Sequence, residues 1–591
     1  MTMGVFSFVS CDKYFEVDSN SAIGQEEILD SEMTYTGIWA FMYNGLENGY
    51  NQVGNTMYAC ACDEADNNQP LSAIQRFNTG SWNGITNPES GSWTSLYAFI
   101  RQANLLIELS DTIANPILAY NDYKRNDPDK YHQLRAEWYA YQIDADFFKA
   151  YYHFELWKRF GGVPIVDKLL NEAEAKRLPQ ATSTEMIAYI EGLIQGILPR
   201  YDILANMPGT RYQITGSDGG QWFPSTTYKE RITQGAALAL LTRAYLYAAS
   251  PLYNGGSYNQ ALCDKAARAA AQIIQLNQYS TVGTNYRDLF LNADNNECII
   301  DSRSAVYYAP AGSTGGSGGV NYPEFWNYPR VGGGGIYEDS RVGGNAVCPS
   351  QNLVDAYQTI KGYAADVTFK WNSNPYDSII DGRFKESIIY PGSVFNNFTI
   401  NTGTNGYAER NTTNSTTTGY FLKKFIRENM NLNAGQTARH VWYIFRYGEV
   451  LLNYAEAALN GTLGAGGNYG AGITAAGALN LLHARPASST GAAVLSKTFT
   501  DAALTNDMVR KERQVELAFE GHRFWDVRRW QIAGTTENAP LGGIGYNRTL
   551  ANPYQRIASV ESRVFIAPKM YFFPIPQDDI RNYPSWTNNG W

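Results

Sequence analysis

Charged residues are scarce in this chain, and long apolar runs are missing. Asp, Glu, Lys and Arg make up 17% of the 591 residues, the net charge is −9, and no run of Lys or Arg stands out. Proteins that bind nucleic acid carry basic patches, so nucleic acid is not an expected partner. No stretch of eighteen apolar residues occurs, so no segment is expected to cross a membrane as a helix.

The usual patterns of metal, redox and nucleotide sites are also missing. The six cysteines form no C-x-x-C pair, and the five histidines are scattered without H-x-x-x-H spacing. Cys60 and Cys62 flank one residue and are interpreted as ordinary buried thiols. The glycine run at 332–335 lacks the lysine and hydroxyl residue of a phosphate loop. We therefore expect no metal and no cofactor.

Aromatic residues, by contrast, are abundant. The chain has 42 Tyr, 26 Phe and 13 Trp, and 44% of its residues are hydrophobic, which is ample material for a large core. Tyr and Trp suit half-buried surfaces that meet sugars, peptides or partner proteins. The composition therefore favours a binding protein.

Helical periodicity recurs along the chain and predicts helical hairpins. The longest predicted helix ends at Gly161-Gly162, with Pro164 just beyond. Paired helices form blocks over about 26–160, 232–276 and 446–530, which suggests tetratricopeptide-like stacking although the strict repeat consensus is missing. The helices expected from the pattern are 26–43, 93–107, 131–160, 232–249, 258–276, 446–460 and 471–483.

Between these blocks the composition changes. Residues 281–440 are rich in Gly, Asn, Ser, Thr and Tyr and contain few long periodic segments. A disordered linker would lack the aromatics found at 322–337, so this region is expected to form ordered loops over the helical base. The predicted fold class is mainly α, with a loop-rich irregular region and short strands.

Residues 509–530 interleave large aromatics with charges, which is unusual for a surface. Glu512, Glu516 and Glu520 are each one helical turn apart, and Gly521 supplies a helix stop. The economical interpretation is one interior helix whose acids pair with Arg513, Arg523, Arg528 or Arg529. Such pairing is expected because removing one partner of a buried ion pair costs roughly 3–5 kcal/mol.

This segment resembles the C-terminal motif of the SusD/RagB family. The helix 446–460 and the Pro-Ile-Pro element at 574–576 also match family patterns, and the resemblance runs from Cys11 to the C-terminus. It implies a tetratricopeptide-like helical superhelix, here a single domain over 26–591. The motif positions met are Glu512, Arg513, Glu516, Leu517, Phe519, Glu520, Gly521, Arg523, Asp526, Arg529 and Trp530.

The resemblance also implies a location and partners. Members of the family are nutrient-binding lipoproteins of the outer membrane that cap a SusC-like TonB-dependent transporter. Residues 1–10 are apolar, end in small residues before Cys11, and look like the remnant of a lipoprotein signal peptide. We therefore expect a lipid anchor on Cys11 and a tether over 11–25, which holds the protein on the cell surface.

Catalytic interpretations are less favoured than binding ones. A glycosidase needs a pair of carboxylates at the scissile bond, but Glu512, Glu516 and Glu520 lie in the most hydrophobic segment and are expected to form structural ion pairs. The acidic stretch 63–68 lacks the spacing of a calcium loop and is interpreted as solvated or substrate-facing surface. The protein is therefore not expected to be an enzyme.

Two non-helical stretches place tryptophan beside polar residues among turn formers. Flat aromatics stack on sugar faces, while Asp, Asn and Arg orient hydroxyl groups. Trp82 is either a ligand platform or part of the core, and Trp326 contacts ligand, transporter or neighbouring loops. The candidate ligand-binding residues are Asp63, Arg76, Asn78, Trp82 and Asn83 in one wall, with Tyr322 and Trp326 in the other.

The predicted function is capture of an oligosaccharide or polysaccharide at the cell surface and its delivery to a SusC-like transporter. Capture of peptides, as in the RagB branch, and a glycoside hydrolase are the alternatives. The sequence does not identify the glycan.

Overall fold

The structure is a computed structural model. It describes residues 32–113, 123–210, 212–214, 222–224, 231–292, 295–303, 322–330, 346–359, 374–432, 436–438, 440–489, 493–495 and 498–591. The lipidation site expected at Cys11, the signal-peptide remnant and the tether lie outside these residues. Among the residues described, no helix combines the length and the apolarity needed to cross a bilayer.

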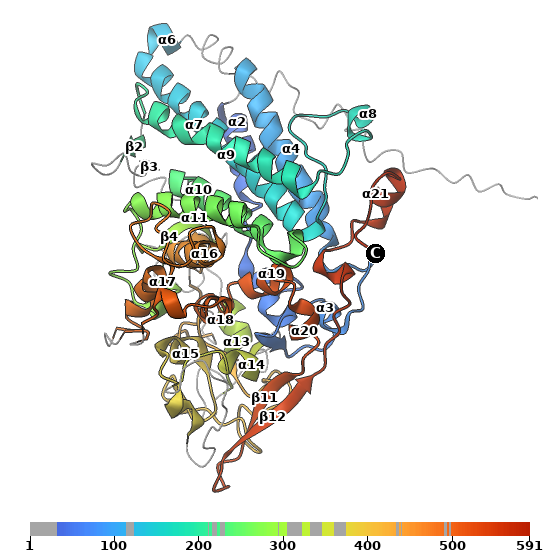
Figure 1. The fold of residues 1–591 in the computed structure, drawn as a ribbon, viewed down its shortest axis with the longest axis vertical. Coiled ribbons are helices and arrows are strands. Elements are labelled where there is room, and N and C mark those ends of the chain that lie inside the picture. The colour runs from blue at the N-terminus through green and yellow to red at the C-terminus, as the bar shows by residue number, and fades with distance from the viewer. Residues whose placement is uncertain are drawn as a thin grey trace, which may run out of the picture.

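Long helices stack side by side in chain order and form most of one half of the molecule (Figure 1). Each helix packs against the next, so the stack is a tetratricopeptide-like superhelix, as the sequence predicts. The helices of eight or more residues are α2 (Glu32–Tyr43), α4 (Ser90–Ile113), α7 (Pro128–Phe160), α9 (Ser183–Ala205), α10 (Gln234–Ala249), α11 (Gln260–Gln275), α16 (Tyr447–Asn460), α17 (Ala475–Ala484), α18 (Asn506–Glu516) and α19 (His522–Arg529).

The longest helix, α7, is held between α4 and α9. Asp127 caps its N-terminus by accepting from the Lys130 amide at 3.0 Å, and Pro128 occupies the first turn, where a missing amide proton has no cost. It ends at Gly161, whose φ of 72° suits glycine. These signals confirm the helix predicted at 131–160 and its C-terminal stop.

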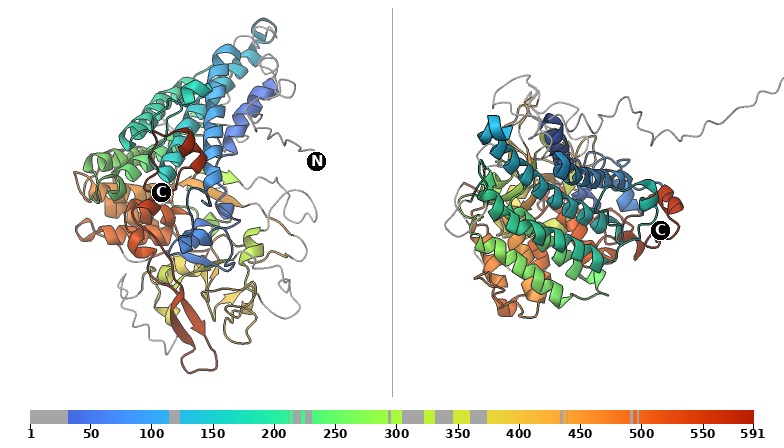
Figure 2. Two further views of the ribbon diagram at one scale, coloured as in Figure 1. Left: turned by 90° about the vertical axis from the view of Figure 1, so that its right-hand side faces the viewer. Right: turned by 90° about the horizontal axis from the view of Figure 1, so that it is seen from above.

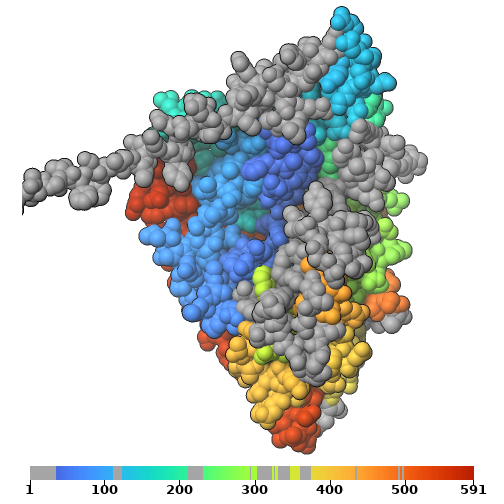
Figure 3. Space-filling model, turned by 180° about the vertical axis from the view of Figure 1, so that it is seen from behind, coloured from blue at the N-terminus to red at the C-terminus, as the bar shows by residue number. Residues whose placement is uncertain are grey.

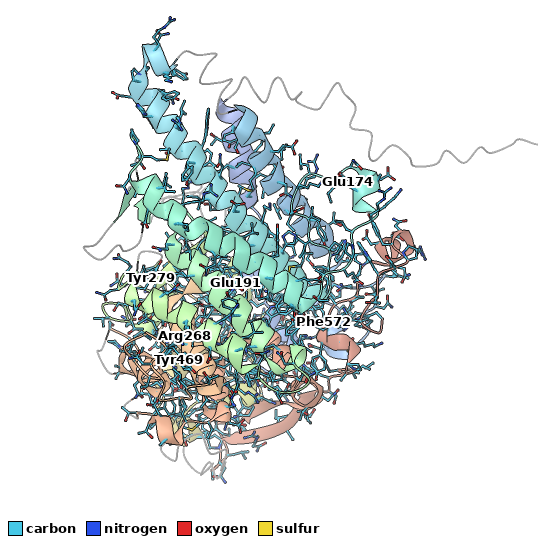
Figure 4. All side chains as sticks on the ribbon, turned by 45° about the horizontal axis from the view of Figure 1, so that its top comes forward. Glu174, Glu191, Arg268, Tyr279, Tyr469 and Phe572 are labelled. Atoms are coloured by element: carbon cyan, nitrogen blue, oxygen red, sulfur yellow. The ribbon has the colours of Figure 1, made fainter. Side chains whose placement is uncertain are left out.

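The two predicted hairpins later in the chain are also confirmed. α10 packs on α11, and α16 packs on α17, with α11 lying against α16. Their interfaces are rich in alanine, which lets the helix axes approach closely. Across the outer side of this stack Lys265 pairs with Glu191 at 2.8 Å, and the Arg268 guanidinium lies over the Tyr469 ring at 5.9 Å (Figure 4).

One long helix, α9, was not among the predicted elements. Its start carries a capping box, in which Thr182 accepts from the Glu185 amide at 3.2 Å and the Glu185 carboxylate accepts from the Thr182 amide at 2.8 Å. The Thr-x-x-Glu spacing was readable in the sequence. The helix lies between α7 and α10 and makes the stack continuous from α2 to α18.

The segment 509–530 forms two helices and not the single helix expected. α18 ends at Glu516, and α19 starts at His522. Between them Phe519 has a φ of 66° and Gly521 a φ of 78°, so the chain turns sharply in a left-handed conformation. Gly521 therefore precedes α19 as its N-cap instead of ending the first helix.

Short strands and helices make up the other half of the molecule, and the β11–β12 hairpin projects from its far end (Figures 1 and 2). The strand pairs, all antiparallel, are β1 (Ala65–Asn67) with β5 (Val347–Pro349), β2 (Tyr212–Ile214) with β3 (Trp222–Pro224), β4 (Cys298–Arg303) with β10 (Val441–Arg446), β6 (Ile388–Ile389) with β9 (Phe421–Leu422), β7 (Val394–Phe395) with β8 (Phe398–Thr399), and β11 (Leu541–Tyr546) with β12 (Tyr554–Glu561).

Shorter helices lie between these strands and also between the long helices, where α6 (Tyr123–Asn126) precedes α7 and α8 (Glu172–Ala175) follows it. The others are α3 (Gln75–Thr79), α12 (Tyr286–Leu289), α13 (Tyr322–Asn327), α14 (Gln351–Val354), α15 (Gly382–Ser387), α20 (Ala533–Thr536) and α21 (Gln577–Asn582). Among the described residues, three of the six strand pairs, β1–β5, β4–β10 and β6–β9, join segments that are far apart in the sequence, and the other three are local hairpins. This region is thus the ordered, loop-rich part that the composition predicts.

Candidate functional site

The acids of α18 lie in a buried network of ion pairs. The Glu516 carboxylate accepts from Arg383 at 2.9 Å, Arg446 at 3.0 Å and Arg485 at 2.6 Å. The side chains of all four residues are at most 1% exposed. Burial alone would raise the pKa of Glu516, but the three guanidinium groups outweigh it and hold that pKa well below its usual value. The carboxylate is therefore ionised and structural.

The partners of these acids are not the ones expected from the sequence. Glu512 pairs with Arg383 at 2.5 Å and with His483 at 3.1 Å, and Glu520 pairs with Arg446 at 2.7 Å and Lys424 at 2.7 Å. These cations come from α15, the end of β10 and the segments around β9 and α17, far away in sequence. Helical spacing identifies neighbours on one helix and does not show which distant cations face it.

The arginines of this segment have other acids as partners. Arg513 and Arg529 both bind Asp526, at 3.1 and 2.8 Å, and Arg529 also reaches Glu456 at 2.5 Å. Arg528 lies over the Phe524 ring at 3.5 Å. The expectation of paired buried charges is confirmed, but the predicted pairing is wrong. No acid of this cluster is left as a protonated group open to a cleft, which a glycosidase would need.

Asp63 and Asn78 are buried structural residues. Both oxygens of Asp63 accept from Arg523, at 2.8 and 2.7 Å, and Asp63 is only 8% exposed. The Asn78 amide donates to the Cys60 carbonyl at 2.9 Å and to the Gln75 side-chain oxygen at 2.7 Å. The Asp63 carboxylate and the Asn78 amide nitrogen are engaged inside the protein, so this burial does not support the expectation that the two residues contact ligand.

Trp82 belongs to the core. It is 3% exposed, and its ring packs on Phe77 at 5.1 Å, Phe573 at 5.7 Å and Trp591 at 4.5 Å. The C-terminal segment closes over it, which the local sequence around Trp82 does not reveal. A buried indole offers no face to a sugar, so the core interpretation of Trp82 holds and the platform interpretation is wrong.

Arg76 and Asn83 are exposed but stand apart from the other predicted wall. Asn83 caps a turn by accepting from the Ile85 amide at 2.8 Å, and Arg76 donates to the Thr86 carbonyl at 3.4 Å. The neighbouring Gly80 and Gly84 lie against residues 564–577 of the C-terminal segment. The residues of the first predicted wall therefore lie in two places. The stretch 63–68 lies beside the segment that contains Trp326, whereas the stretch 76–86 packs against the C-terminal segment.

The β1–β5 pair brings residues 63–68 beside the segment 322–330. Asn68 accepts from the Ala346 amide at 2.9 Å and donates to the Ser415 carbonyl at 3.0 Å. The Asn327 side chain accepts from the Val347 amide at 2.8 Å and so fixes the end of α13 to β5. Two distant stretches and the loop 401–418 therefore meet at one place.

Trp326 lies on a short helix that is firmly held. The fully buried Glu324, two residues before it, accepts from the Arg427 amide at 3.0 Å and contacts the His440 ring at 2.9 Å. Trp326 itself is partly exposed. Tyr322 is the first residue of α13, and the placement of its side chain is outside the described structure. The helix thus presents one tryptophan on a rigid support.

Two further residues on these segments are added to the candidate surface. Leu71, in the turn after β1, is 99% exposed, and Arg330, after α13, donates to the Thr413 carbonyl at 3.3 Å. Both lie inside the stretches that the sequence singles out, 63–83 and 322–337, although neither is among the predicted ligand residues; an apolar residue in a polar turn is the available signal for Leu71. We call Asn68, Leu71, Trp326 and Arg330 the ligand face. Figure 3 shows the blue N-terminal surface above the yellow surface of residues after 374 on one side of the molecule.

A polar pocket of about 320 Å³ lies between α2, α4 and α7. The charged groups of this pocket form ion pairs with one another: Arg159 pairs with Glu47 and Glu155 and lies 3.6 Å from Glu89. Because these charges are satisfied within the protein, this pocket is a weaker candidate for a ligand than the ligand face.

No metal or thiol chemistry is evident near these surfaces. Burial raises the pKa of both Cys60 and Cys62, which keeps them protonated and fits ordinary buried thiols. Asp66 uses its carboxylate to accept from Gln75 at 2.9 Å and Thr417 at 2.6 Å. Within the described ranges, no group of three His, Cys, Asp or Glu side chains is arranged to hold a metal ion.

The fold described above is shared by solved structures of SusD-like proteins. The chain belongs to the SusD/RagB family. Residues 305–591 match the SusD family model, and residues 13–194 match a model described as "Starch-binding associating with outer membrane". No curated protein matches the chain.

Solved structures share the fold over nearly the whole chain. A SusD-like protein from Bacteroides fragilis has a TM-score of 0.71 at 21% identity and covers 96% of this chain and 99% of its own. A SusD-like carbohydrate binding protein from the same species has a TM-score of 0.67 at 21% identity, with 95% and 100% covered. Surface glycan-binding protein A from Bacteroides thetaiotaomicron, in complex with laminarihexaose, has a TM-score of 0.57 at 17% identity, with 95% and 100% covered.

Proposed function

We propose that this protein binds an oligosaccharide at the outer membrane, without cleaving it, and delivers it to a SusC-like TonB-dependent transporter. The observation that carries the proposal is the shared fold: a structure that covers 95% of this chain was solved in complex with laminarihexaose. The family model for residues 13–194 is described by starch binding and association with the outer membrane. The proposed anchor is a lipid on Cys11.

The ligand face has the chemistry that a sugar site needs. Trp326 supplies an aromatic surface, Arg330 follows it on the same segment, and Asn68 is joined to that segment through β1, β5 and Asn327. A rigid aromatic loses little conformational entropy on binding, and one or two such residues often dominate the affinity. Because Glu324 and Asn327 hold α13 in place, Trp326 is the residue most suited to that role.

Substitution of Trp326 tests the proposal. Oligosaccharides and peptides are first screened by glycan array and calorimetry, with the intact protein. Trp326→Ala should then weaken oligosaccharide binding at least tenfold, about 1.4 kcal/mol, with little change in the melting temperature. Val282→Ala, at an exposed valine outside the ligand face, is the control and should bind as the wild type does.

Other outcomes separate the alternatives. Binding of peptides in place of sugars would favour capture of peptides, as in the RagB branch. Release of shortened glycan products would establish a hydrolase. Normal oligosaccharide binding by Trp326→Ala would remove the ligand face from the proposal.

A further inference from the structure

A second pocket lies on the helical half of the molecule, away from the ligand face. Its volume is about 260 Å³, and it is formed by α4, the segment 164–170, α8, α21 and the C-terminal residues. α8 and α21 lie beside the long helices, whereas α13 lies in the half that carries β11 and β12 (Figures 1 and 2). Glu174, labelled in Figure 4, marks α8 at its edge. The pocket is thus separate from the proposed binding surface.

Aromatic rings form one wall of this pocket. Tyr583 and Trp586 stack with ring centroids 4.1 Å apart and planes 8° from parallel, and Trp93 meets Trp586 edge-on at 6.1 Å. The Trp586 indole donates to the Leu178 carbonyl at 3.0 Å, which fixes its orientation. Both stacked residues remain partly exposed. The wall is therefore a rigid, accessible aromatic surface, which is what the face of a pyranose ring stacks on.

The rim of the pocket carries one cation and one carboxylate that lack partners in the described part of the chain. Arg101, exposed on α4, makes no ion pair or side-chain hydrogen bond there, and neither does the Asp579 carboxylate on α21. Both residues line the pocket, yet they are not paired with each other. By contrast, Lys168 at the same rim is engaged by Glu174 at 2.9 Å.

This combination limits the chemistry of the ligand. An anionic ligand would be attracted by Arg101 but repelled by Asp579, and a cationic ligand would be attracted by Asp579 but repelled by Arg101. A neutral molecule with hydroxyl groups satisfies both, because a hydroxyl donates to a carboxylate and accepts from a guanidinium. A volume of about 260 Å³ is small for a ligand site, so it suits one or two ring units of a larger chain.

We propose that this pocket is a second carbohydrate site, which takes a neutral pyranose unit stacked on the Tyr583–Trp586 wall between Asp579 and Arg101. The inference rests on the proposed function for its ligand class only; the pocket does not share a residue with the ligand face. Two sites on separate halves of one protein would hold a long glycan at two points and raise the avidity for chains long enough to reach both.

Neighbouring aspartates on α21 provide a matched pair of variants for the test. Asp579→Asn removes the carboxylate of the pocket, whereas Asp578→Asn changes an exposed residue that pairs with Arg581 at 3.2 Å outside it. Tyr583→Ala removes the stacking surface. The full chain is titrated with neutral gluco-, xylo-, manno- and galacto-oligosaccharides, and binding is followed by calorimetry and by saturation-transfer NMR. Thermal melting of each variant confirms that it is folded.

The expected result is that at least one neutral oligosaccharide binds at this pocket. Asp579→Asn and Tyr583→Ala should each weaken that binding at least tenfold, while Asp578→Asn leaves it unchanged. Should Trp326→Ala abolish all sugar binding while Asp579→Asn and Tyr583→Ala have no effect, the second site is refuted and the ligand face stands. Should Asp579→Asn and Tyr583→Ala abolish all sugar binding while Trp326→Ala has no effect, the second site stands and the ligand face is refuted. If no neutral sugar binds, the second site is overturned, and the ligand face is overturned too if the glycan array that includes charged oligosaccharides is also negative.

Discussion

Removing the charge of Glu516 should destabilise the protein sharply. Glu516→Gln keeps the size of the side chain but leaves Arg383, Arg446 and Arg485 around an uncharged group, at a site where all these side chains are at most 1% exposed. Breaking a buried ion pair by removing one partner costs about 3–5 kcal/mol, because the remaining charge is buried without compensation. We expect a loss of that order in the free energy of unfolding at pH 7.

The pH dependence gives the experiment a second readout. The folded-state pKa of Glu516 is held well below its usual value, so its contribution to stability is present above the pKa of the unfolded chain, ~4.5, and is lost as the pH falls through the folded value. The stability gap between the wild type and Glu516→Gln should therefore be full at pH 7 and shrink on strong acidification.

Urea unfolding followed by fluorescence measures this gap. Glu172→Gln is the control, because Glu172 forms an exposed i,i+4 pair with Lys176 on α8, and its urea midpoint should match that of the wild type. An unchanged midpoint for Glu516→Gln, or a gap that does not depend on pH, would refute the structural role. A fully stable variant that had lost a hydrolytic activity would replace the binding function with an enzymatic one.

Three further predictions concern single residues. Trp82→Ala should lower stability by about 3–5 kcal/mol in urea unfolding, as loss of a buried aromatic does, and leave sugar affinity unchanged; weakened binding at full stability would contradict its place in the core. Burial, and then Asp63, raises the pKa of Glu64 to about 8, so wild-type stability should fall as the pH rises from ~4.5 towards 8, by up to ~1.4 kcal/mol for each pKa unit. In Glu64→Gln that decline should be smaller. If the free energy of unfolding of the wild type and of the variant changed with pH in parallel, Glu64 would not be the cause of the decline. Cys11→Ala in a full-length precursor should release the protein from membranes and abolish lipid labelling, and labelling that persists would rule out Cys11 as the anchor.

Most helices of the helical half could be predicted from the sequence because the signals that define each helix are local, although α9 was not predicted and the packing of α11 on α16 joins distant segments. Each of the main signals occurs within one short stretch of sequence: the apolar spacing, the glycine stop at Gly161, and the alanine-rich faces of α10 and α11. The break between α18 and α19 could not be read in this way. It depends on Phe519 at a positive φ, a conformation that no local preference of phenylalanine indicates.

The candidate site was only partly predictable for the same reason. The stretch around Trp326 stands out in the sequence because it places aromatics among glycines, and its contact with ligand stays a prediction. The burial of Trp82, by contrast, depends on Phe573 and Trp591 at the other end of the chain. Likewise, nothing in the sequence around Asp63 indicates that Arg523, 460 residues later, donates to both of its oxygens. Local patterns identify suitable residue types, and distant partners decide whether those residues face solvent.

The contacts of Asp63 and Trp82 with the C-terminal part also have a consequence for the order in which the chain becomes structured during synthesis. α4, α7 and α9 pack on neighbours made shortly before or after them, so this part of the stack can form while the ribosome is still working. Residues 58–82 cannot reach their final packing until Arg523, Phe573 and Trp591 have been made. We expect the region around β1 to remain open to proteases on nascent chains until the last residues are released.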